Sequence, residues 1–212
     1  MDLVSIASAV VILAYLSLAL ELVIIPVPSA VSAIALINSE RAQGQSWTRQ
    51  FRWLFPALVN IAVFAVPLLQ SCFWLGQVLV QSDGADPAAN AREGLPIAAL
   101  FLGTLLVAVG RSLTVSVALA MRSSKALGLM NGTLELPLQD RGVFQYRRNP
   151  GLLGMYLFAL GVLMLKPSLW FALGFGHYIW HMHRRILMEE DYLVDRFGRD
   201  YEAYLDRTRR YV

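Results

Sequence analysis

Long apolar runs without a charged residue alternate along this chain with short charged connectors. The first run covers Leu3 to Leu20, the second Trp53 to Val80 and the third Leu95 to Ala120, which only Arg111 interrupts. Since about 20 apolar residues in a helix cross the hydrocarbon core of a bilayer, each run predicts a transmembrane helix. The composition, 57% hydrophobic and 16% charged residues, is typical of such a protein and not of a water-soluble domain.

A fourth apolar stretch is divided by Lys166-Pro167 into two arms, Gly151–Leu165 and Ser168–Trp180. The arms predict an antiparallel helical hairpin, because proline ends one helix and can begin the next. Together with the first three runs, the hairpin gives an all-α integral membrane bundle of about five transmembrane helices. The N-terminal run is long enough to span and no basic segment precedes it, so we expect a membrane helix there and not a cleaved signal.

Beyond the hairpin the pattern changes to charged, amphipathic helices. One is expected from His183 onward, and a second over Asp200–Thr208, with Gly198 as the cap between them. The connector Met121–Asn149 is predicted to be a cytoplasmic loop. The apolar run Ser29–Asn38 is too short to span and predicts an interfacial or re-entrant segment.

Lys and Arg are concentrated after the first run, after the third run and beyond the last apolar helix, and are sparse elsewhere. Cytoplasmic segments of membrane proteins carry such an excess of positive charge. We therefore expect the N-terminus outside and the C-terminus in the cytoplasm, in the inner membrane of a bacterium.

Several classes of site are excluded by the residues themselves. The net charge of +3 includes no concentrated basic face, which disfavours nucleic-acid binding. Cys72 is the single cysteine, so no intrachain disulfide is expected. His177 and His181 lack a third strong ligand at a matching position, and no metal site is predicted.

Two charged residues lie within apolar runs. Arg111 would cost at least about 2.5 kcal/mol at that depth unless it is paired, so it is expected to face protein or ligand and not lipid. Glu21 has two readings, a helix-paired carboxylate near a membrane face or a polar group in a ligand cavity. Gly103 and Gly110 permit close helix approach, within the bundle or between subunits, and the oligomeric state stays open.

Polar residues gather at both ends of the hairpin, which an antiparallel pair of helices brings to the same membrane face. They are Arg147, Arg148 and Asn149 before it, and His181, Arg184, Glu189 and Glu190 after it. On spacing alone they could also be a basic flank with helical charge pairs such as Arg185 with Glu189.

The C-terminal third adds a family resemblance. Its pieces in order are Tyr146-Arg147-Arg148-Asn149-Pro150-Gly151-Leu152-Leu153-Gly154, the hairpin, Glu189-Glu190, and Phe197-Gly198-Arg199-Asp200-Tyr201-Glu202-Ala203-Tyr204, followed by Arg207 and Arg209-Arg210. Together they resemble the isoprenylcysteine carboxyl methyltransferase family and the related phospholipid methyltransferases, whose pattern is RHPxYxG, then EE, then FGxxYxxY. Gly110-Arg111 fits the family's helix before the motif.

The resemblance implies an integral membrane enzyme with S-adenosylmethionine in a cytoplasm-facing pocket. The resemblance also implies that the enzyme methylates a lipid-like acceptor reached from the bilayer. A carboxyl or thiol group of an isoprenoid-like molecule is the favoured acceptor. Residues 1–141 are then the N-terminal transmembrane part and residues 142–212 the catalytic part. The implied catalytic residues are Arg148, Asn149 and Glu190. The implied cofactor-binding residues are Tyr146, Arg148, Asn149, Pro150, Leu152, Gly154, His181, Arg184, Glu189, Glu190, Tyr201 and Tyr204.

Two positions depart from the family pattern. Asn149 stands in place of histidine, which excludes a general base there because asparagine does not titrate, and Leu152 stands in place of tyrosine. Charge complementarity pairs Glu190 with the ammonium of the cofactor, and Arg148 or Arg184 with its carboxylate. The ring of Tyr204 or Trp180 could flank the adenine or the sulfonium. The alternatives are lipid N-methylation and a non-catalytic membrane protein that keeps the fold.

Overall fold

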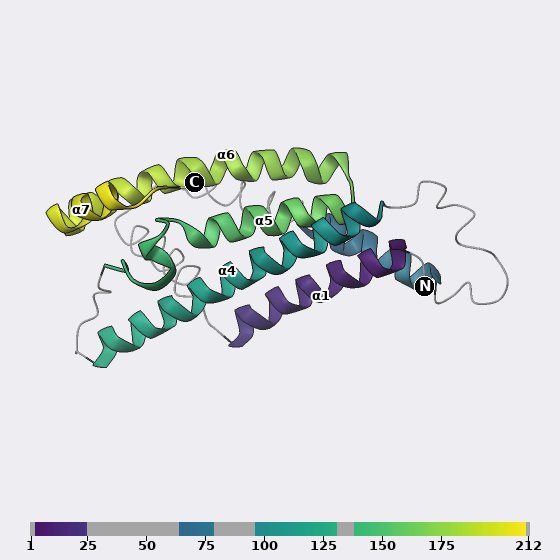
Figure 1. Ribbon diagram of the computed structural model, residues 1–212, viewed down its shortest axis with the longest axis horizontal. Coiled ribbons are helices and arrows are strands. Elements are labelled where there is room, and N and C mark those ends of the chain that lie inside the picture. Colours follow the sequence, from purple (N-terminus) through teal and green to yellow (C-terminus); the bar gives the residue numbers. More distant parts are fainter. Residues whose placement is uncertain (1–2, 25–63, 79–95, 131–137, 211–212) are drawn as a thin grey trace, which may run out of the picture.

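The computed structural model describes residues 3–24, 64–78, 96–130 and 138–210 (Figure 1). Every regular element in these ranges is helical, as the sequence predicts. They are α1 (Leu3–Ile24), a helix over Phe64–Val78, α4 (Ile97–Met130), the 3-10 helix η2 (Gly142–Gln145), α5 (Pro150–Leu165), α6 (Leu169–Phe197) and α7 (Arg199–Arg207). The predicted segment Ser29–Asn38 lies outside the described residues.

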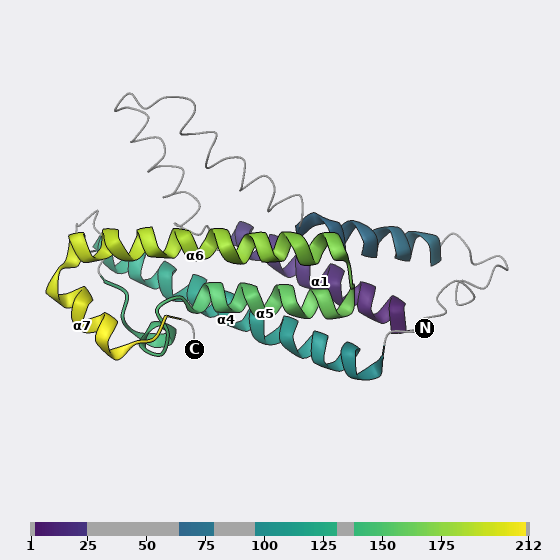
Figure 2. The same ribbon diagram turned by 90° about the horizontal axis from the view of Figure 1, so that it is seen from above.

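The long helices lie side by side with their axes roughly parallel (Figures 1 and 2). Helices α1, α4 and α6 run in one direction, and α5 and the helix Phe64–Val78 run in the other. This alternation agrees with the predicted order of spans. Two segments are long and apolar enough to cross a membrane, Leu3–Glu21 and Ile97–Met121, and two shorter apolar helices, Phe64–Val78 and α5, accompany them.

Large apolar side chains cover the outside of the bundle. Leu13 on α1 is 65% exposed, Phe101 on α4 is 71% exposed and Trp170 on α6 is 74% exposed. Monomeric proteins in water rarely expose so much contiguous apolar surface. Lipid is the solvent that such a surface fits, in agreement with the predicted membrane bundle.

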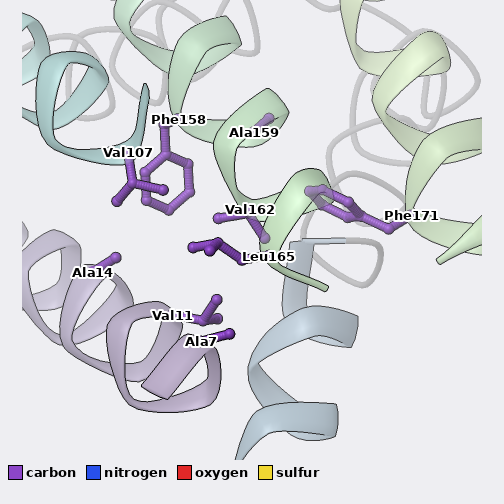
Figure 3. Packing of buried hydrophobic residues seen from close by; sticks show 9 residues of the cluster. All are labelled: Ala7, Val11, Ala14, Val107, Phe158, Ala159, Val162, Leu165 and Phe171. Atoms are coloured by element: carbon purple, nitrogen blue, oxygen red, sulfur yellow. The ribbon is translucent and has the colours of Figure 1, made fainter. Parts of the chain in front are cut away.

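Helix α5 is the central helix of the described bundle. Its residues Phe158, Ala159 and Val162 have no exposed surface, and they pack with side chains of α1, α4 and α6 (Figure 3). The full cluster is Ala7, Val11, Ala14, Val107, Phe158, Ala159, Val162, Leu165 and Phe171. Because α5 is held from several sides, the position of its first turn is well determined.

Two pairs of glycines bring α4 and α5 into backbone contact. A Cβ on Gly110 would lie 2.5 Å from the carbonyl oxygen of Gly154, and a Cβ on Gly161 would lie 2.6 Å from that of Gly103. Small residues allow membrane helices to approach closely where no hydrophobic effect draws them together. Gly103 and Gly110 therefore permit close helix approach within the bundle.

Two predicted boundaries are wrong. Helix α4 continues past Ala120 to Met130, so Met121–Met130 is helix and not the predicted loop. The second arm of the hairpin and the charged helix after His183 form one continuous helix, α6. The reason is the same in both cases: charged residues end an apolar span but do not end a helix, and the predicted cap at Gly198, with φ of 53°, does end α6.

Candidate functional site

The loop before α5 and the first residue of that helix contain Arg148, Asn149 and Pro150, the first part of the family pattern. Asn149 is the residue before the helix and Pro150 its first residue, a position where proline's missing N–H costs nothing. Pro150 is buried, and Arg148 precedes the pair at the end of the bundle. The local sequence therefore fixes where the Arg148 backbone lies.

Glu190 supplies the second half from the far part of α6. Its side chain is buried, with 8% of its surface exposed, and its Oε1 lies 3.4 Å from Nη1 of Arg148. The fold thus brings together two of the three residues implied to be catalytic. Hairpin geometry is the cause, since α5 and α6 run antiparallel and both ends reach the same face of the bundle.

Arg210 completes the cluster. The family resemblance includes it, but it was not among the predicted site residues. Its Nη2 donates to Oε2 of Glu190 at 2.5 Å, and its Nε donates to Oε1 at 3.1 Å. The tail returns to the motif loop through a parallel bridge between Arg147 and Arg209, in which the Arg148 N–H donates to the Arg209 carbonyl at 3.0 Å. From the residues alone, Arg207, Arg209 and Arg210 fit a helix dipole or an anionic membrane surface equally well, so nothing in the sequence assigned Arg210 a role in the site.

The cluster of Arg148, Glu190 and Arg210 leaves a hydrogen-bond donor of Arg148 for a ligand. Among these three side chains, two guanidinium groups face one carboxylate. The Nε of Arg148 is buried and has no hydrogen-bond partner within the described part of the chain. A buried donor without a partner is costly, and a carboxylate from a ligand would satisfy this N–H.

Tyr201 and Tyr204 of α7 close the same end of the bundle. Each has 3% of its surface exposed, and the hydroxyl of Tyr204 donates to the carbonyl of Phe144 at 2.8 Å. Burial, with a smaller contribution from the Glu190 charge, raises the pKa of Tyr201 to about 12. Burial also raises the pKa of Tyr204. Both phenols are therefore protonated at neutral pH, and that of Tyr204 is a donor.

The other predicted site residues are more dispersed. Tyr146 is 70% exposed, and Arg184 is exposed with its guanidinium over the ring of Trp180, 5.3 Å from its centroid. His181 is half-buried and its ring stacks on that of His177. Tyr146 lies in the loop before α5, and the ring contacts of Arg184 and His181 are with other residues of α6 and not with the cluster around Glu190. The side chain of Glu189 lies outside the described residues.

Two further motif positions lie in the first turns of α5. Leu152 is half-buried. Gly154 is buried against Gly110, where a Cβ would come within 2.8 Å of the Gly110 carbonyl oxygen. The structure therefore gives Gly154 a packing role.

Arg111 and Glu21 form a second buried pair within the bundle. The Nη2 of Arg111 donates to Oε2 of Glu21 at 2.5 Å, and Ser17 and Thr114 accept from its other nitrogens at 3.0 and 2.8 Å. Arg111 therefore faces protein, as predicted, and Glu21 is a helix-paired carboxylate. The pair joins α1 to α4.

Fold and cluster together define a helical membrane protein with a charged site at one end of an antiparallel hairpin. Residues 98–200 of the chain match the family model described as phospholipid methyltransferase. The matched region contains α5, α6 and nearly all of α4, and therefore both Arg148 and Glu190.

Two known proteins are similar to part of the chain, and both are named protein-S-isoprenylcysteine O-methyltransferase. The protein of Schizosaccharomyces pombe is 39% identical over 64 residues, which are 30% of this chain and 27% of that protein. The protein of Dictyostelium discoideum is 32% identical over 68 residues, which are 32% of this chain and 29% of that protein. This chain thus matches less than a third of the length of either relative. No solved structure matches it.

These findings confirm the resemblance read from the motif residues. The chain resembles the isoprenylcysteine carboxyl methyltransferases and the phospholipid methyltransferases in the region that forms the hairpin and its charged site.

Proposed function

We propose that this protein is an integral membrane methyltransferase that uses S-adenosylmethionine to methylate a carboxylate on an isoprenoid-like, membrane-embedded molecule. The observation that carries the proposal is the contact between Arg148 and Glu190. Two motif residues far apart in the sequence meet in one buried cluster, as a shared ligand site requires. The family resemblance supports the reaction class.

The residues of the cluster fit the amino-acid end of the cofactor. Arg148 offers a buried Nε without a partner in the described residues, which suits a carboxylate. Glu190 offers the negative charge for an ammonium. When bound, S-adenosylmethionine supplies a methyl group on a positively charged sulfur, an electrophile that needs no further activation.

The side chains in the cluster favour an acceptor that is already an anion. Asn149 does not titrate, the guanidinium of Arg148 has donors and no acceptor, and the raised pKa of Tyr201 keeps its hydroxyl protonated at neutral pH. Glu190 is held between two guanidinium groups. None of these four groups is suited to remove a proton, and a carboxylate acceptor needs no base whereas an ammonium acceptor does.

Positioning would then supply most of the catalysis. Methyl transfer is an in-line displacement, and holding both reactants in line in a water-poor site lowers its barrier. The apolar exposed surface of α4 and α6 gives a lipophilic acceptor a route through the bilayer to the end of the hairpin. The protein would be surrounded by membrane lipids, and no nucleic-acid partner is proposed.

Lipid N-methylation is the second candidate. The match of residues 98–200 to the phospholipid methyltransferase model favours it. It requires a base near the acceptor nitrogen, which the four cluster residues named above do not supply.

The orientation follows from charge. We propose that the Arg-rich end of the bundle, with α7, faces the cytoplasm. The first turn of α1 lies at the other end of the bundle (Figure 1), and we propose that this end lies outside. The inner membrane of a bacterium stays a prediction.

Calorimetric titration of the detergent-purified protein with S-adenosylmethionine tests the cofactor. We expect micromolar binding that Glu190→Ala and Arg148→Ala each weaken by about a hundredfold. Glu190→Ala would leave the ligand ammonium without a counter-ion in the site, and Arg148→Ala would do the same to the ligand carboxylate. A folded wild-type protein that does not bind the cofactor would favour the non-catalytic alternative.

Transfer of labelled methyl tests the acceptor. An S-prenylated cysteine with a free carboxylate should accept the label, and its methyl ester is the matched control that should not. The product should release labelled methanol in alkali, because a carboxyl methyl ester hydrolyses there whereas an N-methyl or S-methyl group does not. Label on phosphatidylethanolamine would support the second candidate instead.

A further inference from the structure

We propose that the face of α6 that carries Trp180, His181 and Arg184 binds the phosphate head group of an anionic phospholipid from the surrounding membrane. The family resemblance implied a cofactor role for His181 and Arg184, but their ring contacts are within α6 and not with the cluster around Glu190. The inference goes beyond the proposed function and needs only that the bundle spans a membrane. The lipid bound here is a partner of the protein and not its methyl acceptor.

Rings and positive charges follow one another along this face of α6. His177, Trp180, His181 and Arg184 lie at intervals of three and four residues, which places them on the same side of a helix. The rings of His177 and His181 are stacked with their centroids 6.2 Å apart, and the ring of His177 lies 6.0 Å from that of Trp180. The guanidinium of Arg184 lies over the Trp180 ring, 5.3 Å from its centroid. These four residues form the polar stripe of α6.

Arg184 is a charge without a counter-ion in the described part of the chain. It is exposed, and no carboxylate described there lies within ion-pair distance of it. Trp180 beneath it is 56% exposed, so the pair is open to a ligand from outside the bundle. The ring holds one face of the guanidinium, and the fork of N–H groups at its edge fits a phosphate at two points.

The hairpin determines the level of Arg184 in the membrane. Arg184 is 15 residues beyond the first residue of α6, and the first residue of α5 is 15 residues before the last. Since the two helices run antiparallel from one turn (Figure 2), Arg184 lies level with the start of α5, at the end of the bundle that holds Arg148. It is about 22 Å from the turn, and in a hydrocarbon core about 30 Å thick its long side chain reaches the head groups.

The apolar part of a lipid has partners on the same helix. Leu173 and Trp170 precede Arg184 on α6 and are 59% and 74% exposed. Leu173 lies about 16 Å from Arg184 along the helix, which is roughly the depth of the acyl chains in one leaflet. An anionic lipid is favoured over a zwitterionic one, because the polar stripe includes no carboxylate to pair with a choline or ethanolamine group.

Native mass spectrometry of the delipidated protein in detergent tests the proposal. The probes are phosphatidylglycerol, which has no amine to accept a methyl group, and phosphatidylcholine with the same acyl chains. The wild type should bind phosphatidylglycerol about fivefold more tightly than phosphatidylcholine. Arg184→Ala should remove this preference and change the affinity for phosphatidylcholine by less than about twofold. Arg184→Lys should keep part of the preference, because it retains the charge and loses the fork.

Arg196→Ala is the matched control. Arg196 is also exposed on α6, and its guanidinium also lies over an aromatic ring, that of Phe197, 5.5 Å from the centroid. It lies about 18 Å beyond Arg184 along the helix, outside the hydrocarbon core, so its loss should leave the preference unchanged. Trp180→Leu keeps an apolar side chain and removes the ring, and it should lower the affinity for phosphatidylglycerol by about two- to threefold.

Inorganic phosphate separates the two sources of the same chemistry. It lacks acyl chains, so it should not displace phosphatidylglycerol from the wild type. Displacement would assign the polar stripe to a soluble anion and overturn the lipid proposal. Equal losses of preference in Arg184→Ala and Arg196→Ala would overturn it as well, because net charge alone would then explain the binding.

A last outcome concerns the cofactor. If Arg184→Ala lowers the affinity for S-adenosylhomocysteine and leaves that for phosphatidylglycerol unchanged, Arg184 belongs to the cofactor site and the inference is wrong. None of the lipid measurements depends on methyl transfer. Failure of this inference and failure of the proposed function are therefore distinguishable.

Discussion

Two buried clusters of arginine and glutamate lie at different levels of this protein. The inner one, Arg111 with Glu21, joins α1 to α4 within the apolar bundle. The outer one, Arg148 and Arg210 with Glu190, lies where the hairpin ends and the tail returns. They use the same side chains and differ in composition, in bonding and in the parts of the chain that supply them.

The inner cluster is electrically balanced and closed. One guanidinium faces one carboxylate, and Nε, Nη1 and Nη2 of Arg111 all donate to oxygens of Ser17, Thr114 or Glu21. Both side chains are about nine-tenths buried. No ligand is needed to complete it.

The outer cluster has a buried N–H on Arg148 without a partner in the described residues. Its members come from a loop, from α6 and from the tail after α7. The comparison teaches that burial of a charged pair does not by itself mark a site. An incomplete set of hydrogen bonds is the feature that separates a ligand site from a charged pair that only stabilises the fold.

The largest effect is expected from breaking the inner cluster. Glu21→Ala leaves Arg111 buried without its counter-ion, and this should lower the free energy of unfolding by about 3–5 kcal/mol. Thermal unfolding in detergent measures the loss. The folded fraction should bind S-adenosylhomocysteine as the wild type does.

The double variant Arg111→Met with Glu21→Met is its control. Replacing both partners of a buried pair by apolar residues is often neutral, so much of the stability should return. Glu190→Gln in the same assays should show the reverse pattern, a loss of binding with a smaller change in melting temperature. If Glu21→Ala changes binding more than stability, the distinction between the two clusters is wrong.

The glycine contact between the two clusters gives the next effect. Gly110→Ala would place its Cβ 2.5 Å from the Gly154 carbonyl oxygen and 2.5 Å from the Phe158 nitrogen, so α4 and α5 must separate. We expect a loss of about 1–3 kcal/mol in thermal unfolding.

Gly176→Ala on α6 is the matched control, because nothing lies within 4 Å of a Cβ there. Its better helix propensity should raise stability by up to about 1 kcal/mol. Equal melting temperatures for the two alanine variants would show that the close approach of α4 and α5 is not required.

Alkaline pH tests whether the Tyr201 hydroxyl is buried at the end of the bundle that holds the outer cluster. The pKa of Tyr201 is raised by burial to about 12, while an unfolded tyrosine ionises near pH 10. Its contribution to stability is therefore complete below pH 10 and is lost as pH rises from about 10 to 12. Denaturation midpoints should fall in this range by the equivalent of about 1 kcal/mol at pH 11.

Tyr201→Phe isolates this contribution. The variant lacks the titrating hydroxyl and should show a shallower alkaline decline than the wild type. An unchanged slope would mean that the phenol is not buried in the folded protein.

The smallest effect is expected at the surface. Arg207 pairs with Asp140 at 2.5 Å, but their side chains are 56% and 33% exposed. Arg207→Ala should therefore cost less than about 1 kcal/mol, and high salt should reduce the difference from wild type. A loss in thermal stability as large as that of Glu21→Ala would show that the motif loop depends on this pair.

The amino-acid sequence determined the helical class, the hairpin at Lys166-Pro167 and the cap at Gly198. These follow from hydrophobicity and backbone preference, which are local properties of a chain. It also indicated that Arg148 and Glu190 would share a membrane face, since short connections force neighbouring helices to run antiparallel. The helix ends were less well predicted, because α4 and α6 continue through charged residues beyond their apolar spans.

Tertiary structure alone decided the partners. Gly110 meets Gly154, Arg111 meets Glu21, and Arg210 meets Glu190 only because packing brings segments together that have no local pattern in common. An arginine near a chain end has the same local signature whether it faces lipid, solvent or a buried carboxylate. The difference lies in burial and in the hydrogen bonds of its neighbours, and those are set by the whole fold.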